Sequence, residues 1–431
     1  MKYLHISTKV ELELCKLHES RLVESGCKIL NCLGKNIDDS LTKFEIVNFH
    51  NIKKGESLRP SDVDYLSQGI NLVGLWERGV GWHKKANYHR AIYDITLIHE
   101  KVKSAISEYS INTLYIAMIP HSVIDYLLAL EVEKSGGSVI YLSPSFLPWA
   151  QCIWQGISER KRIKPVGYNY EQLNSLKQKK FNGRDITSGQ LLLIEQEKKY
   201  KLNFKKMLSV SNILRGLIIL LWKIEKRSNE RALSDKSIVA YLHYQPEATN
   251  NPFFGNLTQQ FFLLKPLKIS YNRRIFVREH PNQLIEAPPF RSSARWFGFY
   301  KKLCNDYNLK ITSNAISLQE MLEKNCHIFS IAGSVLFEYG SLGGSIIFPV
   351  SSPIFDKNEI VSMFGDNICE DGLFVKLEGK TFETLTQIEL KMTITTKDDK
   401  LDHTTEDRVN NLIDFIVESS NATDNVEKKQ T

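Results

Sequence analysis

The sequence predicts an α/β protein of two Rossmann-like domains, and three observations support this prediction. First, 431 residues exceed what one hydrophobic core normally organises, so two domains of roughly 200 residues each are expected. Second, apolar runs of strand length alternate with segments of helical periodicity, which is typical of a parallel sheet covered by helices on both faces. Third, several apolar runs end abruptly in polar residues, as strands do where they deliver side chains to a ligand.

Composition excludes several other classes. Hydrophobic residues make up 42% of the chain and charged residues 24%, which is usual for a globular protein and not for a disordered or fibrous one. The formal net charge of +7 permits an anionic substrate, a nucleic acid or an anionic membrane surface and chooses none of them. The seven cysteines are dispersed without a CxxC pair, so reduced thiols are expected rather than structural zinc. Because no signal peptide and no membrane span is recognisable, we expect a cytoplasmic protein.

The first half of the chain, residues 1–150, reads as an N-terminal Rossmann-like domain. The strands expected there are Lys2–Ile6, Lys28–Leu33, Phe44–Phe49, Thr113–Met118 and Val139–Leu142. The helices expected between them are Val10–Glu24, Tyr88–Tyr109 and a segment that Pro120-His121 opens and Gly136-Gly137 closes. Strand, helix and strand at this spacing predict parallel pairing, because parallel neighbours need a crossover connection.

A basic segment over 151–235 follows and is expected to link the two domains. It contains two lysine-rich stretches before the apolar run Ile213–Ile224, and Lys226, Arg227 and Arg231 come directly after that run. One interpretation is a basic amphipathic helix that lies on an anionic inner-membrane surface. The other, which we favour from the sequence, is a linker helix whose apolar face packs between domains and whose charges are solvated.

The second domain is expected over 236–395. Its expected strands are Ser237–Tyr244, Ile275–Pro281, Lys310–Ser313, His327–Ile331 and Ser345–Val350. Its expected helices are Ala294–Tyr307, Leu318–Lys324 and Val335–Leu342, with Ser317 as the N-cap of the second. The remaining region, 396–431, is expected to form a terminal helix over Glu406–Ser419 and a disordered tail.

Polar groups follow three strands of this second domain. The candidate residues, in chain order, are Glu247, Arg278, His280, Pro281, Gly333, Ser334 and Glu338. Pro281 has no amide N–H and therefore ends its strand. Gly333 allows close backbone approach and Ser334 can cap the following helix, so this turn suits a phosphate or a ribose. Glu338 lies one turn along on the same helix face, although an ordinary capped helix packed through its glycines explains the pattern equally simply.

The chemistry of His280 and Glu247 suggests group transfer. A histidine that donates to a phosphate stabilises a departing nucleotide, and Arg278 next to it adds positive charge. A carboxylate at Glu247 can act as a base or as a nucleophile toward the anomeric carbon of a sugar. The alternatives are that His280 is a satisfied core histidine and that Glu247 caps a neighbouring helix.

A second pair of candidates opens a helix of the N-terminal domain. His121 and Asp125 are spaced i, i+4, so their side chains face the same way on a helix. Either group can activate an acceptor hydroxyl as a general base. The alternative is a helix N-terminus with a favourable acidic first turn.

The motifs HYQPEATNNPFFG, REHP and IAGSVLFEYGSLGGSIIFPV, in this order, resemble bacterial capsule and surface-polysaccharide glycosyltransferases. In particular they are similar to the Kdo transferases of capsule and lipopolysaccharide assembly and to relatives that transfer nonulosonic acids. The resemblance implies a GT-B arrangement of two Rossmann-like domains facing across a cleft, with the acceptor on the N-terminal side and the donor in the C-terminal domain. It also implies a CMP-activated ulosonic acid as donor and neither a cofactor nor an obligatory metal.

Carried over by motif, the resemblance implies that His280 and Pro281 meet the cytidine phosphate. It likewise places Ser334 and Glu338 against the nucleotide and Glu247 against the reacting sugar. Glu247 departs from some relatives, which carry Asp there, so the choice between retention and inversion of the anomeric centre stays open.

The function implied is a metal-independent glycosyltransferase that adds a Kdo or sialic-like residue to a growing surface polysaccharide. Its expected partners are the nucleotide-sugar donor and a glycan or lipid-linked glycan acceptor, with possible contact to the inner face of the cytoplasmic membrane and no nucleic acid. Two alternatives stay open. One is a transferase that uses a UDP- or GDP-sugar or a polyol phosphate. The other is a non-catalytic nucleotide-binding component of a polysaccharide assembly complex.

Overall fold

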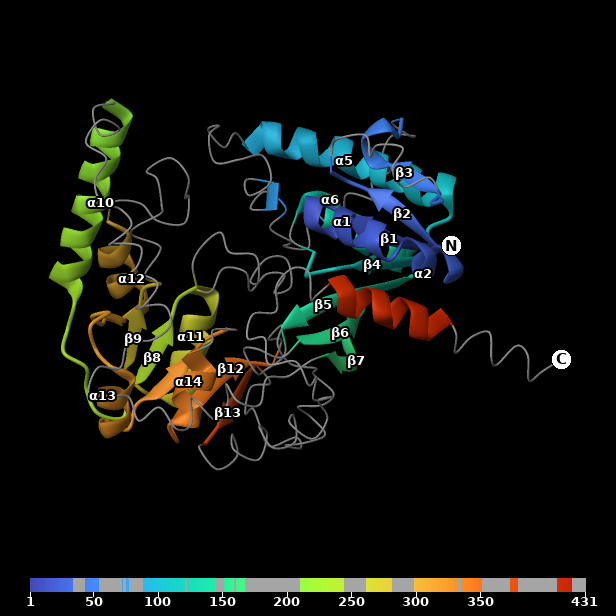
Figure 1. The fold of residues 1–431 in the computed structure, drawn as a ribbon. Helices are drawn as coiled ribbons and strands as arrows, with labels where there is room; N and C mark the ends of the chain where they lie inside the picture. The colour runs from blue at the N-terminus through green and yellow to red at the C-terminus, as the bar shows by residue number, and fades with distance from the viewer. Residues whose placement is uncertain are drawn as a thin grey trace. The chain divides into compact units, whose positions relative to one another are not determined.

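The computed structural model forms two compact units (Figure 1). The residues that it describes are 1–33, 43–53, 72, 75–76, 88–120, 122–144, 151–158, 160–166, 210–243, 261–280, 298–331, 335–350, 373–378 and 409–420. The first unit comprises Met1–Gly79, Asn87–Tyr170 and Leu390–Thr431, and the second comprises Val80–Ala86 and Glu171–Glu389. No helix among these described residues is long and apolar enough to cross a membrane.

The first unit is built on a sheet of seven strands in the order β3-β2-β1-β4-β5-β6-β7. The strands are β1 (Lys2–Ile6), β2 (Cys27–Asn31), β3 (Ile46–Asn48), β4 (Thr113–Ile116), β5 (Ser138–Pro144), β6 (Gln151–Gln155) and β7 (Lys161–Val166). Strands β1 to β5 pair in parallel, and β6 and β7 extend the sheet antiparallel. The direction of winding therefore reverses between β1 and β4, which is the position where doubly wound sheets bind ligands.

Helices cover this sheet with their apolar sides. They are α1 (Lys9–Leu17), α2 (Glu19–Glu24), α5 (Tyr88–Tyr109), α6 (Val123–Lys134) and a terminal helix over 409–420. The prediction of one helix over 10–24 is wrong, because the backbone leaves helical geometry at His18 (φ −108°, ψ 21°) and divides the segment into α1 and α2. The terminal helix buries Leu412, Ile413 and Ile416 in the same core as Leu4 of β1.

The second unit repeats the same winding order. Its six-stranded sheet has the order β10-β9-β8-β11-β12-β13. The strands are β8 (Ile238–Tyr241), β9 (Ile275–Arg278), β10 (Lys310–Ile311), β11 (His327–Phe329), β12 (Ser345–Pro349) and β13 (Phe374–Leu377). All neighbours pair in parallel except β13, which is antiparallel to β12. The winding reverses between β8 and β11, so the predicted class, an α/β protein with two Rossmann-like sheets, is confirmed.

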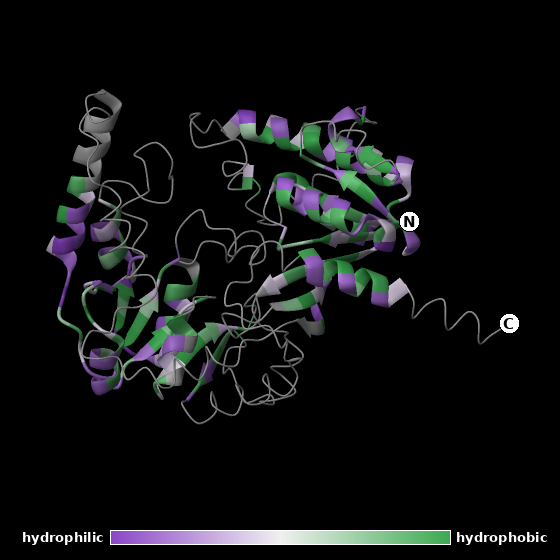
Figure 2. Ribbon diagram, in the orientation of Figure 1, coloured by the Kyte–Doolittle hydropathy of each residue, from purple (hydrophilic) through white to green (hydrophobic). Residues whose placement is uncertain are grey.

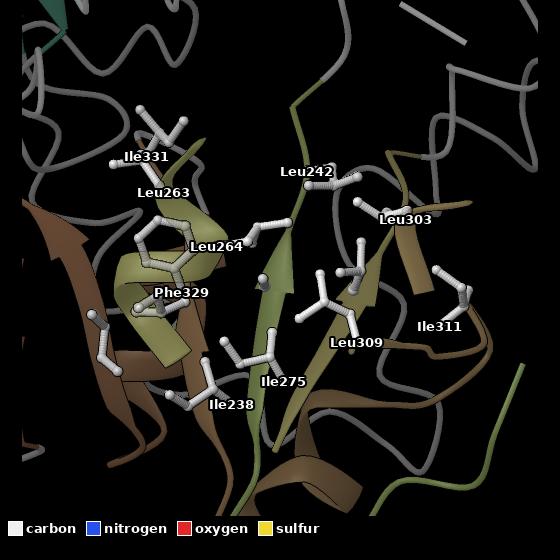
Figure 3. Close-up of a cluster of buried hydrophobic side chains, with 14 of the residues drawn as sticks. Ile238, Leu242, Leu263, Leu264, Ile275, Leu303, Leu309, Ile311, Phe329 and Ile331 are labelled. Carbon is white, nitrogen blue, oxygen red and sulfur yellow. The ribbon is translucent and has the colours of Figure 1, made fainter. Parts of the chain in front are cut away.

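The helices of the second unit are α10 (Val210–Asn229), α11 (Phe261–Tyr271), α12 (Phe299–Tyr307), α13 (Leu318–Glu323) and α14 (Val335–Ser341). The sequence did not predict α11, because Pro266 lies inside it and turn-forming residues precede it. Figure 3 shows how α11 is held: its Leu263 and Leu264 belong to one buried cluster with the strand residues Ile238 and Phe329. Burial of such side chains stabilises each by about 1.5–3 kcal/mol.

The segment 151–235, expected as a linker, supplies elements to both units. Strands β6 and β7 hydrogen-bond to the first sheet, and α10 packs against α12 in the second unit. The two lysine-rich stretches and the expected C-terminal tail lie outside the described residues.

Candidate functional site

Three strands that the sequence singled out are neighbours in the second sheet. β8 pairs with β9 on one side and with β11 on the other, and all three run in the same direction. Their carboxyl ends therefore meet at one edge, at the reversal between β8 and β11. The motifs QPE, EHP and GSxxFE follow these three ends in the sequence, and this edge is where an open α/β sheet binds ligands.

The structure describes only part of the predicted site. Arg278, His280, Glu338 and, in the first unit, Asp125 are described. The other predicted site residues, Glu247, Pro281, Gly333, Ser334 and His121, lie outside the described residues. Their roles stay predictions from the sequence.

His243 and Ser330 bridge the two strands at the reversal. Nε2 of His243, the second residue after β8, lies 3.1 Å from Oγ of Ser330, which directly follows β11. Both side chains are buried. Because a hydroxyl can donate or accept, Ser330 can satisfy this ring nitrogen in either tautomer of His243. Neither residue was predicted from the sequence, although a polar residue at the end of a buried apolar run was the signal for both.

Arg278 serves the architecture of this edge. Its Nη1 donates to the carbonyl of Ile316 at 2.7 Å, and its Nη2 donates to the carbonyl of Asn314 at 2.8 Å. The guanidinium carbon lies 5.0 Å from the centre of the Tyr241 ring, which is cation–π distance. A buried cation is tolerated here because several groups replace its hydration. Through these contacts Arg278 joins β9 to β8 and to the loop after β10, which is a structural role. Its contact with a nucleotide stays a prediction.

The side chain of Glu279 fixes the backbone conformation at His280. This carboxylate is 1% exposed; its Oε1 accepts from the backbone N–H of His280 at 2.9 Å, and its Oε2 accepts from the Tyr300 hydroxyl at 2.9 Å. Both carboxylate oxygens are thus hydrogen-bonded, as a buried carboxylate requires. The peptide of His280 is therefore anchored to α12, while its side chain is partly exposed. That is the arrangement expected of a positioned group at a binding edge.

Glu338 lies within electrostatic range of the same edge. Burial, opposed by Arg278 and reinforced by Glu338, raises the pKa of Tyr241 to about 12. The Tyr241 hydroxyl consequently stays protonated at neutral pH and donates to Sδ of Met321 at 3.6 Å. Glu338 itself is partly exposed.

Asp125 performs two structural functions at the start of α6. Its backbone N–H donates to Oγ of Ser122 at 3.1 Å, and its Oδ2 accepts from the backbone N–H of Ser122 at 3.1 Å, which completes a capping box. Its Oδ1 lies 3.1 Å from Nε2 of His5 on β1. The capping alternative thus accounts for the position of Asp125, and its role toward an acceptor stays a prediction.

His5 was not selected from the sequence, although it is a polar residue in the buried run KYLHI. Burial opposes its protonation, but the neighbouring Cys32 and Asp125 together raise the pKa of His5 well above its usual value. Burial also raises the pKa of the Cys32 thiol, against the lowering effect of His5. The pair His5–Asp125 spans the reversal between β1 and β4, as His243–Ser330 spans the one in the second sheet.

The described residues contain no group of three or more His, Cys, Asp or Glu side chains placed to hold a metal ion. Independence of a metal stays a prediction from the sequence.

The fold and these side chains define a class: an α/β protein of two doubly wound units with polar side chains at the carboxyl ends of its strands. No protein-family model matches the chain, and the search of curated proteins gives no match.

Several solved structures are similar to the chain at low sequence identity. One is Thermosulfurimonas dismutans KpsC, described as a β-Kdo 2,7 transferase, with 12% identity over 80% of this chain and 77% of that chain and a TM-score of 0.29. A second KpsC structure, described as a β-Kdo 2,4 transferase, has 11% identity over 55% and 68%, with a TM-score of 0.23. A glycosyltransferase from Rickettsia africae has 10% identity over 97% and 93%, with a TM-score of 0.20. TM-scores of this size establish no common fold, so the class of this chain follows from its own sheets and side chains.

Proposed function

We propose that this chain is a glycosyltransferase that uses a nucleotide-activated sugar, and that the donor is a CMP-activated ulosonic acid. One observation carries the proposal. The three motifs QPE, EHP and GSxxFE, which resemble those of capsule and lipopolysaccharide transferases, follow three neighbouring parallel strands, β8, β9 and β11. Motifs that lie between positions 245 and 338 of the sequence therefore follow strand ends at one edge of one sheet.

In the proposed mechanism, His280 donates a hydrogen bond to the phosphate that leaves with the nucleotide. Charge that develops on the leaving oxygen is stabilised by such a preorganised donor, an effect worth roughly 2–4 kcal/mol. The anchoring of the His280 peptide by Glu279 supports this role, because it removes backbone freedom before the donor binds. Glu247 would meet the positive charge at the anomeric carbon, either as an electrostatic stabiliser or through a covalent sugar adduct.

Nucleotide titration tests the proposal. Isothermal titration of the full chain with CMP, UDP and GDP, each with and without Mg²⁺, is expected to show binding of CMP without the metal. His280→Ala is expected to weaken binding or transfer while its thermal unfolding stays that of the wild type. His89→Ala, an exposed histidine of α5 in the first unit, is the matched control. Preferential binding of UDP or GDP would show that the donor is a UDP- or GDP-sugar and not a CMP-sugar. Binding of none of the three nucleotides would overturn the proposal.

Glu247→Gln tests the chemical step separately from binding. The substitution is nearly isosteric, so CMP binding should persist while transfer falls by about 100-fold or more. Intact-mass spectrometry of protein incubated with donor looks for a sugar adduct on this residue. A fully active Glu247→Gln variant would refute both versions of the mechanism. Nucleotide binding without any transfer would instead favour a non-catalytic component of an assembly complex.

A further inference from the structure

Helix α10 has one side that is fixed to the second unit. Trp222 and Lys226 on this side are buried. Glu225 caps α12 from the same side: its Oε2 accepts from the backbone N–H of Gly298 at 2.9 Å, and its Oε1 accepts from the N–H groups of Tyr300 at 2.8 Å and Lys301 at 3.1 Å. A carboxylate at a helix N-terminus satisfies amides that have no partner inside the helix and is favoured by the helix dipole. The described half of α10 is therefore held in a fixed rotation about its axis.

The opposite side of α10 presents aliphatic side chains to solvent. Leu220 is 52% exposed, Leu221 is 45% exposed and Ile224 is 55% exposed. At 3.6 residues per turn these three lie together on one side, away from Trp222 and Lys226. Figure 2 shows hydrophobic and hydrophilic residues next to one another on the described part of this helix. Single exposed apolar residues are ordinary, but three within five positions form a patch.

The exposed charges around these side chains are positive. Lys223 and Arg227 are exposed and lie on the same half of the helix as Leu220 and Ile224. The two carboxylates of this stretch are engaged elsewhere: Glu225 accepts from the amides of α12, and Glu230 accepts from Lys226 at 2.7 Å. We call Leu220, Leu221, Lys223, Ile224 and Arg227 the α10 patch.

We infer that the α10 patch docks on an anionic membrane surface. A helix with exposed aliphatic side chains bordered by Lys and Arg fits the boundary between lipid headgroups and acyl chains. The aliphatic groups enter the apolar layer, and the long basic side chains extend to the phosphates. Glu225 is held against the amides of α12 and Glu230 is paired with Lys226, so the charged groups that border the exposed aliphatic side chains are the cations Lys223 and Arg227. The sequence alone favoured a linker helix whose apolar face packs between domains, because it did not reveal which side of α10 is covered.

Vesicle sedimentation of the full chain tests the inference. The probes are vesicles of phosphatidylcholine alone and of phosphatidylcholine mixed in equal amounts with phosphatidylglycerol. The wild type is expected to bind the mixed vesicles more tightly. Lys223→Gln with Arg227→Gln should weaken that binding about 25-fold, at about fivefold for each charge near the surface. Leu220→Glu with Ile224→Glu should abolish binding to both kinds of vesicle.

Leu17→Glu is the matched control. Leu17 is a leucine of α1 with 73% exposure, outside the α10 patch, and its substitution should leave vesicle binding unchanged. Because all the substituted residues are exposed, thermal unfolding should be the same in every variant. Absence of wild-type binding, or binding that both double variants retain, would overturn the inference. A concentration-dependent dimer that Leu220→Glu with Ile224→Glu dissociates would show a contact between copies instead and would also overturn it. The assay contains no nucleotide, so its failure leaves the proposed function untouched.

Discussion

The ion pair between Asp125 and His5 allows a prediction with a defined sign in pH. Asp125→Asn keeps the size of the side chain and an oxygen that can still accept from the Ser122 amide, but it removes the charge that faces His5 at 3.1 Å. Both partners are almost fully buried. Removal of one member of a buried pair costs about 3–5 kcal/mol. We expect about 3 kcal/mol, because His5 can lose its proton when the carboxylate is absent.

The loss of stability in Asp125→Asn should depend on pH, because the charge of His5 depends on pH. The folded-state pKa of His5 is raised above the value of about 6.5 expected in the unfolded chain. Its contribution to stability is therefore fully present below that unfolded value and is lost as the pH rises through the folded pKa. Asp125→Asn should consequently destabilise the protein more at pH 6 than at pH 9.

Urea unfolding at these two pH values, followed by circular dichroism, measures the effect. The control is Ser122→Ala, which removes the side-chain cap from the N–H of Asp125 and should cost about 1 kcal/mol at both pH values. An equal loss for Asp125→Asn at pH 6 and pH 9 would show that His5 is neutral and would refute the reasoning. If the folded variant also transfers sugar at the wild-type rate, Asp125 is not the base that activates the acceptor.

Three further predictions concern stability. Glu225→Gln should lower the free energy of unfolding by about 2 kcal/mol, because three backbone amides at the start of α12 lose a charged acceptor. Urea unfolding measures this free energy, and a loss below about 0.5 kcal/mol would contradict the capping role of Glu225. Burial and the nearby Arg273 lower the pKa of His327 to about 4, so the contribution of His327 to stability should fall by up to about 3 kcal/mol between pH 6.5 and pH 4, as the unfolded chain gains a proton first. His327→Asn should make the pH dependence of stability shallower by this amount, and an unchanged slope would exclude a contribution from His327. Gly344→Ala places a Cβ within 2.5 Å of the Tyr339 ring and should cost about 1–3 kcal/mol in thermal unfolding; a wild-type melting temperature would show that the ring can move.

Local sequence patterns predicted most of the elements that position the site. The expected strand Lys2–Ile6 and the expected helix Tyr88–Tyr109 coincide with β1 and α5. Ser317 caps α13 as predicted, because its Oγ accepts from the N–H of Glu320 at 3.0 Å. These features depend on periodicity and on side chains within four residues of one another, which a sequence displays directly.

Pairs of residues distant in the chain were not predictable in the same way. The sequence marked His280 and Arg278 as equal candidates for a ligand. The structure separates them, because Arg278 is held by two carbonyls of another loop whereas the His280 side chain is partly exposed. The contact of His243 with Ser330 joins positions 87 residues apart. No local pattern encodes such a contact, since it depends on β8 and β11 becoming neighbours.

The fold class of the protein follows from local patterns in its sequence. Alternation of strands and helices implies parallel sheets, and polar residues at strand ends imply one edge at which ligands bind. Only the folded chain shows which strands are neighbours, which polar groups are hydrogen-bonded within the protein, and which side of α10 is covered. The physical reason is that burial and hydrogen bonding between distant segments depend on packing. A side chain such as Asp125 or Glu225 has the same local sequence whether it faces a substrate or caps a helix, and only its partner in space distinguishes the two.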